Sequence, residues 1–286
     1  MKKILVTGAN GQLGQCLQKI SSQFEEFEFI FTDSETLDIT NKEEVNDFFW
    51  QNAPDFCINA AAYTAVDLAE TDIEKAFLVN ADGTENLAEA CAENNAQFIH
   101  VSTDYVFDGE NNLAYTEEDF TNPLGVYGAS KLAGDELALE VNPCSVILRT
   151  SWVYSEFGKN FVKTMLNLFA TKDELNIVAD QFGQPTNAND LAEAIMKIIK
   201  SEKITPGIFN FSNLGRISWF DFAEKIAELS EAKIKLNAIE TSQYPTPAKR
   251  PKNSVLDLDK ISKTYAIQLK PWEESLEGCV QILQNN

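Results

Sequence analysis

The sequence predicts an α/β protein built on a doubly wound parallel sheet, with a smaller α/β lobe towards the C-terminus. Three observations predict this fold. Short apolar runs alternate with helical patterns through the first 150 residues. Those runs are apolar at nearly every position, as in parallel strands whose two faces are both covered. A glycine-rich turn also separates the first strand from the first helix, where such folds bind ligands.

Strand and helix patterns follow one another regularly in the first half of the chain. Five apolar runs are predicted strands, at residues 3–7, 28–32, 55–59, 97–102 and 145–150. Apolar residues recur at helical spacing between them, at residues 13–20, 43–50, 72–93 and 126–140. We therefore expect residues 1–150 to form one sheet-based domain.

The alternation loosens after about residue 151. Helical patterns at residues 160–169, 188–200 and 219–230 are separated by predicted short strands at 175–179 and 208–211. Residues 243–253 contain three prolines, which predict a non-helical loop. We expect residues 151–286 to form mainly a substrate-binding lobe, with some segments returning to the first sheet.

Charge and composition exclude several classes of partner. The formal net charge is -21 at pH 7, and a field of that sign repels nucleic acid and anionic lipid. No stretch approaches the roughly 18 apolar residues that span a bilayer. We therefore expect neither a nucleic acid nor a membrane partner, and an anionic ligand would need a local cluster of donors.

Cysteine and histidine usage narrows the chemistry. The five cysteines are scattered and form no Cys-x-x-Cys pair, which is typical of reduced thiols in a cytoplasm. The first apolar run ends at Thr7, so it is shorter than the roughly 7–15 residues of a signal peptide. Together these features predict a cytoplasmic location. His100 is the only histidine, which excludes a histidine-based metal site.

The turn after the first strand has the spacing G-x-x-G-x-x-G, with Gly8, Gly11 and Gly14. One glycine permits a tight turn, one lets the backbone approach a pyrophosphate, and one lets helix and strand pack closely. The helix N-terminus then offers free N–H groups to the phosphates. This pattern predicts that residues 1–150 form a dinucleotide-binding Rossmann domain.

The second predicted strand ends at Asp33, which can accept hydrogen bonds from the adenosine ribose. An acid there repels a 2′-phosphate, which favours NADH over strict use of NADPH. A solvated turn aspartate would look the same in the sequence. Asp38 and Ile39, in the next turn, are an alternative contact with the adenosine.

Tyr127 and Lys131 are four residues apart in a predicted helix, so they share one face. A nearby ammonium lowers the pKa of a tyrosine from ~10 towards neutrality, which would make Tyr127 a proton donor. Such a pair is common by chance, but this one follows a glycine fingerprint in the same predicted sheet. Ser102 and Thr103 end the fourth strand, at the edge where ligands bind.

Eight motifs together give the chain a family resemblance over nearly its whole length. They are GANGQLG at 8–14, LDIT at 37–40, NAAAYTAVD at 59–67, STDYVFDG at 102–109, PLGVYGASKLAGD at 123–135, RTSWVY at 149–154, DQFGQPT at 180–186 and YPTPAKRPKNS at 244–254. With them the sequence resembles the dTDP-4-dehydrorhamnose reductases, a family of the extended short-chain dehydrogenase/reductase superfamily. The resemblance implies hydride transfer from NADPH or NADH to the C4 keto group of dTDP-4-dehydro-6-deoxy-L-mannose.

The resemblance also implies roles for individual residues. Thr103, Tyr127 and Lys131 match the catalytic residues: Tyr127 protonates the C4 oxygen, Lys131 tunes that phenol, and Thr103 donates to the developing alkoxide. Residues that match cofactor contacts are Gly11, Gln12, Leu13, Asp38, Ile39, Ala62, Tyr63 and Thr64. Asp104 and Trp152 match sugar-nucleotide contacts, although a tryptophan just past a strand is also a common core residue.

The proline-rich loop carries the densest positive charge in the chain, at Lys249, Arg250 and Lys252. Arg250 is our candidate for holding a substrate diphosphate against the negative net charge. A basic loop that is merely solvated remains the alternative.

Some members of the family bind Mg²⁺ between two subunits through glutamates, and the matching positions here are Cys16 and Asn189, with Asp190 adjacent. We therefore predict no metal site, and a monomer or a homodimer. A nucleotide-sugar epimerase or 4,6-dehydratase on the same scaffold is the first alternative function. Asp104 lacks the second carboxylate that a dehydratase needs. A regulatory subunit of the methionine adenosyltransferase type is the other alternative, and the intact Tyr127 and Lys131 disfavour it.

Overall fold

The computed structural model describes residues 1–285. At its centre lies a six-stranded sheet in which every pair of neighbours is parallel. In spatial order its strands are β10 (Gly207–Asn210), β5 (Val146–Thr150), β4 (Gln97–Thr103), β3 (Phe56–Asn59), β1 (Lys2–Thr7) and β2 (Phe27–Phe31). The predicted doubly wound α/β fold is confirmed.

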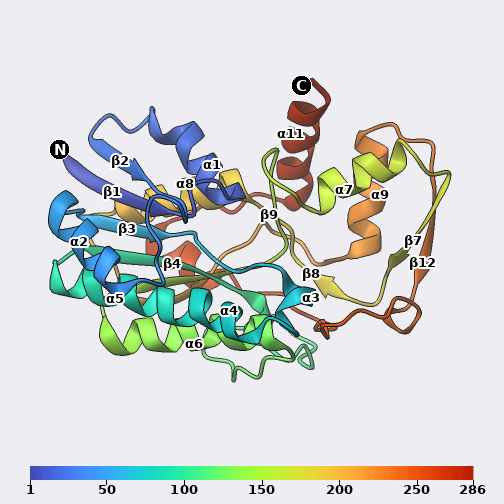
Figure 1. The fold of residues 1–286 in the computed structure, drawn as a ribbon. Helices are drawn as coiled ribbons and strands as arrows, with labels where there is room; N and C mark the ends of the chain where they lie inside the picture. The colour runs from blue at the N-terminus through green and yellow to red at the C-terminus, as the bar shows by residue number, and fades with distance from the viewer. Residues whose placement is uncertain (286) are drawn as a thin grey trace.

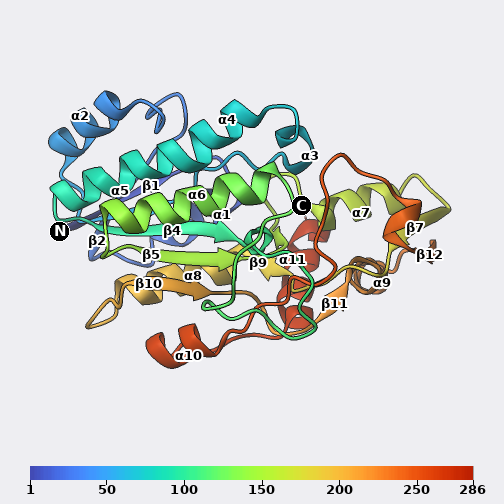
Figure 2. The same cartoon turned by 90° about the horizontal axis from the view of Figure 1, so that it is seen from below.

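Helices cover both faces of this sheet (Figure 1). On one face lie α1 (Gln12–Ser21) and α8 (Ala188–Ile199). On the other lie α2 (Lys42–Asn52), α5 (Gly83–Glu93) and α6 (Val126–Val141). Figure 2, seen from below, shows α5 and α6 side by side in front of the strands.

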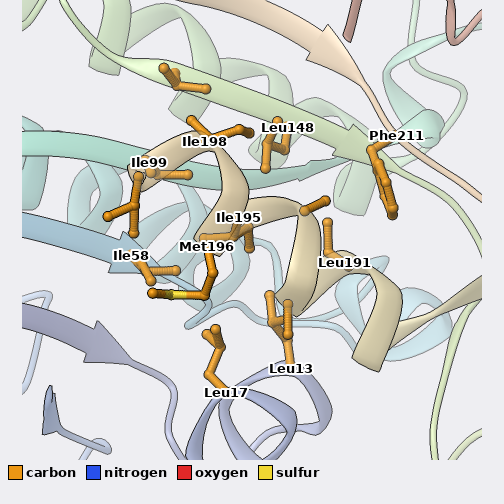
Figure 3. Packing of buried hydrophobic residues seen from close by; sticks show 14 of the residues in the cluster. Leu13, Leu17, Ile58, Ile99, Leu148, Leu191, Ile195, Met196, Ile198 and Phe211 are labelled. Carbon is orange, nitrogen blue, oxygen red and sulfur yellow. The ribbon is translucent and has the colours of Figure 1, made fainter. Parts of the chain in front are cut away.

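Successive side chains of a strand point to opposite faces of the sheet and belong to two separate hydrophobic clusters. Ile4 and Val6 pack towards α1 and α8, whereas Leu5 packs towards α2 and α5. All three side chains are fully buried, so each removes apolar surface from water, at about 25 cal/mol per Å². Figure 3 shows the first cluster, in which Leu13 and Leu17 of α1 lie near Ile195 and Met196 of α8, on the face of the sheet that these two helices cover.

The order of the strands creates a crevice at one edge of the sheet. From β1 the chain passes first to β2 on one side and then to β3 on the other. The connections that leave the carboxyl ends of β1 and β3 therefore diverge, and ligands of open α/β sheets bind where they part.

The long helix predicted over residues 72–93 is helical throughout but contains a break in register. It consists of α4 (Ile73–Phe77), the π-helical turn η1 (Leu78–Asp82) and α5. A π turn inserts an extra residue per turn and often lies at a functional site. Here it directs Asn80, which is fully buried, towards the crevice-lining segment after β3.

Residues beyond 150 contribute to the sheet and also build a second cluster beside it. The predicted strand at 208–211 is the edge strand β10, and the predicted helix at 188–200 is α8. The second cluster is formed by α7 (Phe161–Phe169), α9 (Trp219–Leu229), α11 (Trp272–Asn285) and the parallel pair β7 (Glu174–Val178) and β12 (Lys235–Ile239). Figure 1 shows these elements to the right of the sheet.

The sequence patterns missed α3 (Val66–Ala69), β12, α10 (Asp259–Tyr265) and α11. β12 is only half-buried and α3 is a single turn, so neither has an apolar period of its own. α11 contains a glycine and three glutamates, which weaken its helical pattern. Its buried face carries the apolar residues Trp272, Leu276 and Val280. None of the helices described over residues 1–285 is long and apolar enough to cross a membrane.

Candidate active site

A cleft of about 610 Å³ opens at the carboxyl ends of β1, β3 and β4. The glycine loop and the segment after β3 line one side, and the end of β4 and the first turns of α6 line the other. Trp152 and Trp219, from the second half of the chain, border it as well. The cleft therefore lies where the two halves of the molecule meet.

The glycine loop is shaped so tightly that side chains would not fit. Gly8 has a left-handed φ of +68°, and a Cβ there would lie 2.6 Å from the Ala61 nitrogen. A Cβ on Gly14 would lie 2.4 Å from the Gly8 oxygen. Gly11 precedes α1 with no side-chain cap, so the free N–H groups of α1 and Gln12 and Leu13 at its start face the cleft. This geometry fits a pyrophosphate.

The residues predicted to contact the adenosine lie outside the lining of this cleft. Asp33 accepts from Asn10 of the glycine loop at 2.5 Å and from Thr36 at 3.0 Å. The Thr36 hydrogen bond is the main reason that the pKa of Asp33 is lowered. Asp38 accepts from the Thr40 hydroxyl at 2.7 Å. Ile39 is buried against Gly83 at the start of α5.

The segment after β3 is held in place by Asn80. Ala62 and Thr64 line the cleft. Tyr63 instead has its backbone clamped, because its N–H donates to Asn80 Oδ1 at 2.8 Å and its carbonyl accepts from Asn80 Nδ2 at 3.1 Å. Asn80 also donates to Ser130 of α6 at 2.9 Å. Sequence reasoning missed Asn80, since only the π turn brings it here.

Two glycines let α6 approach the strand ends closely. A Cβ on Gly128 would lie 2.2 Å from the Tyr105 oxygen, and one on Gly134 would lie 2.1 Å from the Asn80 oxygen. This packing brings Tyr127 and Lys131, one helical turn apart, into the lining of the cleft. The sequence spacing therefore predicted that Tyr127 and Lys131 share one face of α6. The two glycines decide how closely that helix approaches the ends of the strands.

The expected tuning of Tyr127 by Lys131 is wrong for this structure. Burial raises the pKa of Tyr127 to about 12, and burial lowers the pKa of Lys131 to about 8. Lys131 Nζ is bonded elsewhere, because it donates to the Val101 carbonyl at 2.8 Å and contacts His100 Nε2 at 2.9 Å. Tyr127 is thus a neutral phenol at neutral pH, with its proton available to donate.

Thr103 and Asp104 lie beside that phenol at the end of β4. The Thr103 hydroxyl donates to Asp104 Oδ1 at 3.1 Å, and a hydrogen bond with Thr103 acts to lower the pKa of Tyr127. Asp104 Oδ2 is buried without a partner, and burial raises the pKa of this carboxyl to about 7. An unpartnered acceptor in a cleft is costly unless a ligand supplies the donor.

Trp152 is a cleft residue as well as a packing residue. Its backbone has a left-handed φ of +48°, which is rare for a bulky side chain. Its ring stacks on Trp219 with centroids 3.5 Å apart, and a Cβ on Gly183 would lie 2.6 Å from it. Both indoles border the cleft, and Trp219 was missed because helical periodicity assigned it only to a helix.

Arg250 lies on a neighbouring groove of about 440 Å³ rather than on the cleft itself. Trp219 lines both hollows, so the groove adjoins the cleft. The guanidinium forms a two-pronged pair with Asp67, at 2.8 Å and 3.1 Å. This pair joins the proline-rich loop to the segment that follows β3.

The positions that match metal ligands in the family are occupied by a hydrogen-bonded cluster. Cys16 is fully buried. Asn189 donates to Glu156 at 2.8 Å, and Lys19 pairs with the same carboxylate at 2.6 Å. Within residues 1–285, no three His, Cys, Asp or Glu side chains gather as a metal site would require.

Comparison with known families decides the classification. The profile of the RmlD substrate binding domain matches residues 1–285. The chain belongs to this family. A curated member from Aggregatibacter actinomycetemcomitans, named dTDP-4-dehydrorhamnose reductase, is 45% identical over 97% of this chain and 98% of its own length.

Solved structures of the family resemble this RmlD-family chain over its full length. A dTDP-4-dehydrorhamnose reductase from Clostridium acetobutylicum is 43% identical, covers 99% of both chains and superposes with a TM-score of 0.94. One from Bacillus anthracis, solved in complex with NADP, is 38% identical with a TM-score of 0.95, over 99% of this chain and 100% of that one.

Proposed function

We propose that this RmlD-family chain is a dTDP-4-dehydrorhamnose reductase, which reduces the C4 keto group of dTDP-4-dehydro-6-deoxy-L-mannose with NADPH or NADH. One observation carries the proposal. The neutral phenol of Tyr127 and the unpartnered carboxylate oxygen of Asp104 share a cleft with the uncapped N-terminus of α1. A proton donor, a sugar-binding acceptor and a pyrophosphate site thus face one another.

Different residues of the chain bind the cofactor and donate to the substrate. When bound, NADPH or NADH supplies the hydride. Gly8, Gly11 and Gly14 give the pyrophosphate access to the N–H groups of α1. Tyr127 donates its proton to the C4 oxygen, and Thr103 donates a hydrogen bond to the same oxygen as charge develops.

The choice between the two nicotinamide cofactors rests on the end of β2. Asp33 already accepts from Asn10 and Thr36, so its carboxylate is partly satisfied by the protein and less free to select a ribose hydroxyl. The relative from Bacillus anthracis binds NADP. We therefore propose that both cofactors are used.

The substrate occupies the side of the cleft that residues 151–286 build. We propose that this part of the chain, apart from β10 and α8, is the substrate-binding lobe. Asp104 and Trp152 contact the sugar, and Arg250 pairs with the diphosphate. Because Asp67 neutralises Arg250 here, the diphosphate must replace a carboxylate that already satisfies the guanidinium.

Two alternative functions make different predictions. An epimerase or dehydratase returns the hydride and consumes no cofactor, and Asp104 stands without a second carboxylate beside it. A regulatory subunit of the methionine adenosyltransferase type would need no proton donor in the cleft. We propose a cytoplasmic enzyme without nucleic acid or membrane partners, as a monomer or a homodimer.

A coupled optical assay tests the proposal. Purified chain is mixed with NADPH or NADH and with dTDP-linked or UDP-linked 4-keto-6-deoxy sugars, and absorbance of the reduced cofactor is followed. We expect one cofactor oxidised per dTDP-sugar reduced. Sugar conversion without cofactor oxidation would assign an epimerase or dehydratase. No conversion, together with complex formation with methionine adenosyltransferase, would assign the regulatory subunit.

A further inference from the structure

The buried environment behind Lys131 contains a histidine that the proposed reaction does not use. His100 lies on β4 and is fully buried. Its Nε2 lies 2.9 Å from Lys131 Nζ, and its Nδ1 lies 3.0 Å from Asn59 Nδ2. The proton on this ring must lie on one of two nitrogens, and the neighbours on each side decide which.

The orientation of the Asn59 amide is fixed by a donor that cannot reverse. Its Oδ1 accepts from the Ala61 backbone N–H at 3.1 Å and from the Thr7 hydroxyl at 2.8 Å. A flipped amide would place two N–H groups against each other at Ala61. The Asn59 NH₂ group therefore faces His100 and also donates to Thr84 at 3.3 Å.

That orientation determines the tautomer of His100. An amide N–H pointing at Nδ1 requires a lone pair there, so the ring proton lies on Nε2. The Nε2–H then points towards Lys131 Nζ. An ammonium at 2.9 Å would oppose one donor with another, whereas a neutral amine accepts the hydrogen bond with its lone pair.

We propose that Asn59 holds His100 as its Nε2–H tautomer, and that His100 thereby acts as a positioning residue that disfavours the ammonium form of Lys131 relative to the neutral amine. Burial acts in the same direction on both partners, since it lowers the pKa of Lys131 to about 8 and the pKa of His100 well below its usual value.

The surroundings also place a buried carboxylate near the same ring nitrogen. Asp135 Oδ1 lies 3.8 Å from His100 Nε2 and is buried without a hydrogen-bond partner. The other oxygen of Asp135 accepts from Ser102 at 2.9 Å and from Arg149 at 3.3 Å. The charge of Asp135 acts to raise the pKa of Lys131, so this carboxylate opposes the effect of His100.

Nuclear magnetic resonance of the histidine tests the tautomer directly. His100 is the only imidazole in the chain, so tag-free protein labelled with ¹⁵N-histidine gives one set of ring signals. We expect a pyridine-like Nδ1 and a pyrrole-like Nε2 from pH 6 to pH 9. A protonated Nδ1 or an imidazolium in that range overturns the proposal. The measurement needs no substrate, so its result is independent of the reductase proposal.

The variant Asn59→Asp tests the consequence for Lys131, which rests on the proposed function. A carboxylate accepts from Nδ1–H, so it reverses the tautomer and lets Nε2 accept from a Lys131 ammonium. We expect the ring signals to exchange character. The alkaline limb of kcat, where Lys131 loses its proton, should move up by about one pH unit or more. Unchanged signals and an unchanged limb overturn the proposal.

Two further variants separate tautomer control from simple destabilisation. Asn142→Asp also places a carboxylate at a buried asparagine, one that accepts from the Cys144 N–H at the end of α6. It should leave the His100 signals and the pH profile unchanged. His100→Gln can offer an amide oxygen to the ammonium, so the alkaline limb should again move up. A limb that stays in place in His100→Gln contradicts the role of His100.

Discussion

The two sides of the cleft are built from different groups. The glycine-loop side presents backbone N–H groups of Gly11, Gln12 and Leu13, and its shape depends on missing Cβ atoms. The α6 side presents the titratable groups of Asp104, Tyr127 and Lys131. On the first side binding depends on steric fit, and on the second chemistry depends on proton positions that burial sets.

The difference shows what a substitution on each side should do. A side chain added to a glycine of the loop should keep the backbone away from the pyrophosphate. Such a substitution should therefore change cofactor affinity, because this side of the cleft contributes backbone N–H groups and no titratable side chains. Removing a titratable group on the α6 side changes turnover or pH dependence while leaving the pyrophosphate contacts intact. Substitutions on both sides, and in the loop that carries Arg250, therefore test the contrast.

The largest effect is expected for Tyr127→Phe. Loss of the phenol proton should lower kcat about 10³-fold, within the range for a general acid, while the affinity for the reduced cofactor changes little. Steady-state assays and a cofactor titration measure the two quantities. Tyr265→Phe, which removes a hydroxyl that donates to the Thr205 carbonyl far from the cleft, should keep kcat. Near-full activity of Tyr127→Phe would show that Tyr127 is not the acid.

On the glycine side, Gly14→Ala should weaken cofactor binding about 100-fold. Its methyl group would lie 2.4 Å from the Gly8 oxygen, so the loop must shift away from the pyrophosphate, at a cost of about 2.7 kcal/mol. Calorimetric titration measures the dissociation constant. Gly278→Ala in α11, where a Cβ meets no atom within 4 Å, is the matched control. Equal affinities for the two variants would contradict the steric argument.

Asp104→Asn should stabilise the fold and impair the substrate side. The pKa of Asp104 is raised from its usual 3.8 to about 7, so its carboxyl favours folding below pH 3.8 and this contribution is lost as pH rises through 7. At pH 8 the amide should raise the free energy of unfolding by about 2 kcal/mol, less than the full shift implies because its NH₂ is also buried. The gain should vanish near pH 4.

Denaturant unfolding at both pH values measures this effect. Asp108→Asn is the control of opposite sign, because hydrogen bonds, the Glu110 N–H first among them, lower the pKa of Asp108. That variant should lose stability at pH 8 rather than gain it. If Asp104→Asn is stabilised equally at pH 4 and pH 8, burial does not raise the pKa of the Asp104 carboxyl.

The smallest effect is expected in the proline-rich loop. Arg250→Met should raise the KM for the nucleotide sugar about tenfold, or about 1.4 kcal/mol, with kcat nearly unchanged. The measured salt dependence of KM should also weaken, because one charge contact with the diphosphate is lost. Lys263→Met in α10 removes the same charge at an exposed pair with Asp259 and should alter neither quantity. A KM that does not respond to Arg250→Met would remove this residue from the substrate site.

Features that depend on local chain geometry could be predicted from the sequence. The strands, the covering helices of the first half and the glycine loop all follow from short-range periodicity and from missing Cβ atoms. The shared face of Tyr127 and Lys131 followed from their spacing of four. Elements without a period of their own, such as β12 and α3, take their form from the neighbours they pack against.

What only the tertiary structure decided is the environment of each charge. The partners of Lys131, Asn59 and Arg250 lie 31, 41 and 183 residues away in the chain, so no local pattern encodes them. Burial then reversed the expected pKa of Tyr127, because desolvation depends on packing and outweighs a nearby cation that bonds elsewhere. The sequence determined which groups stand at the site, and the folded packing decided where their protons lie.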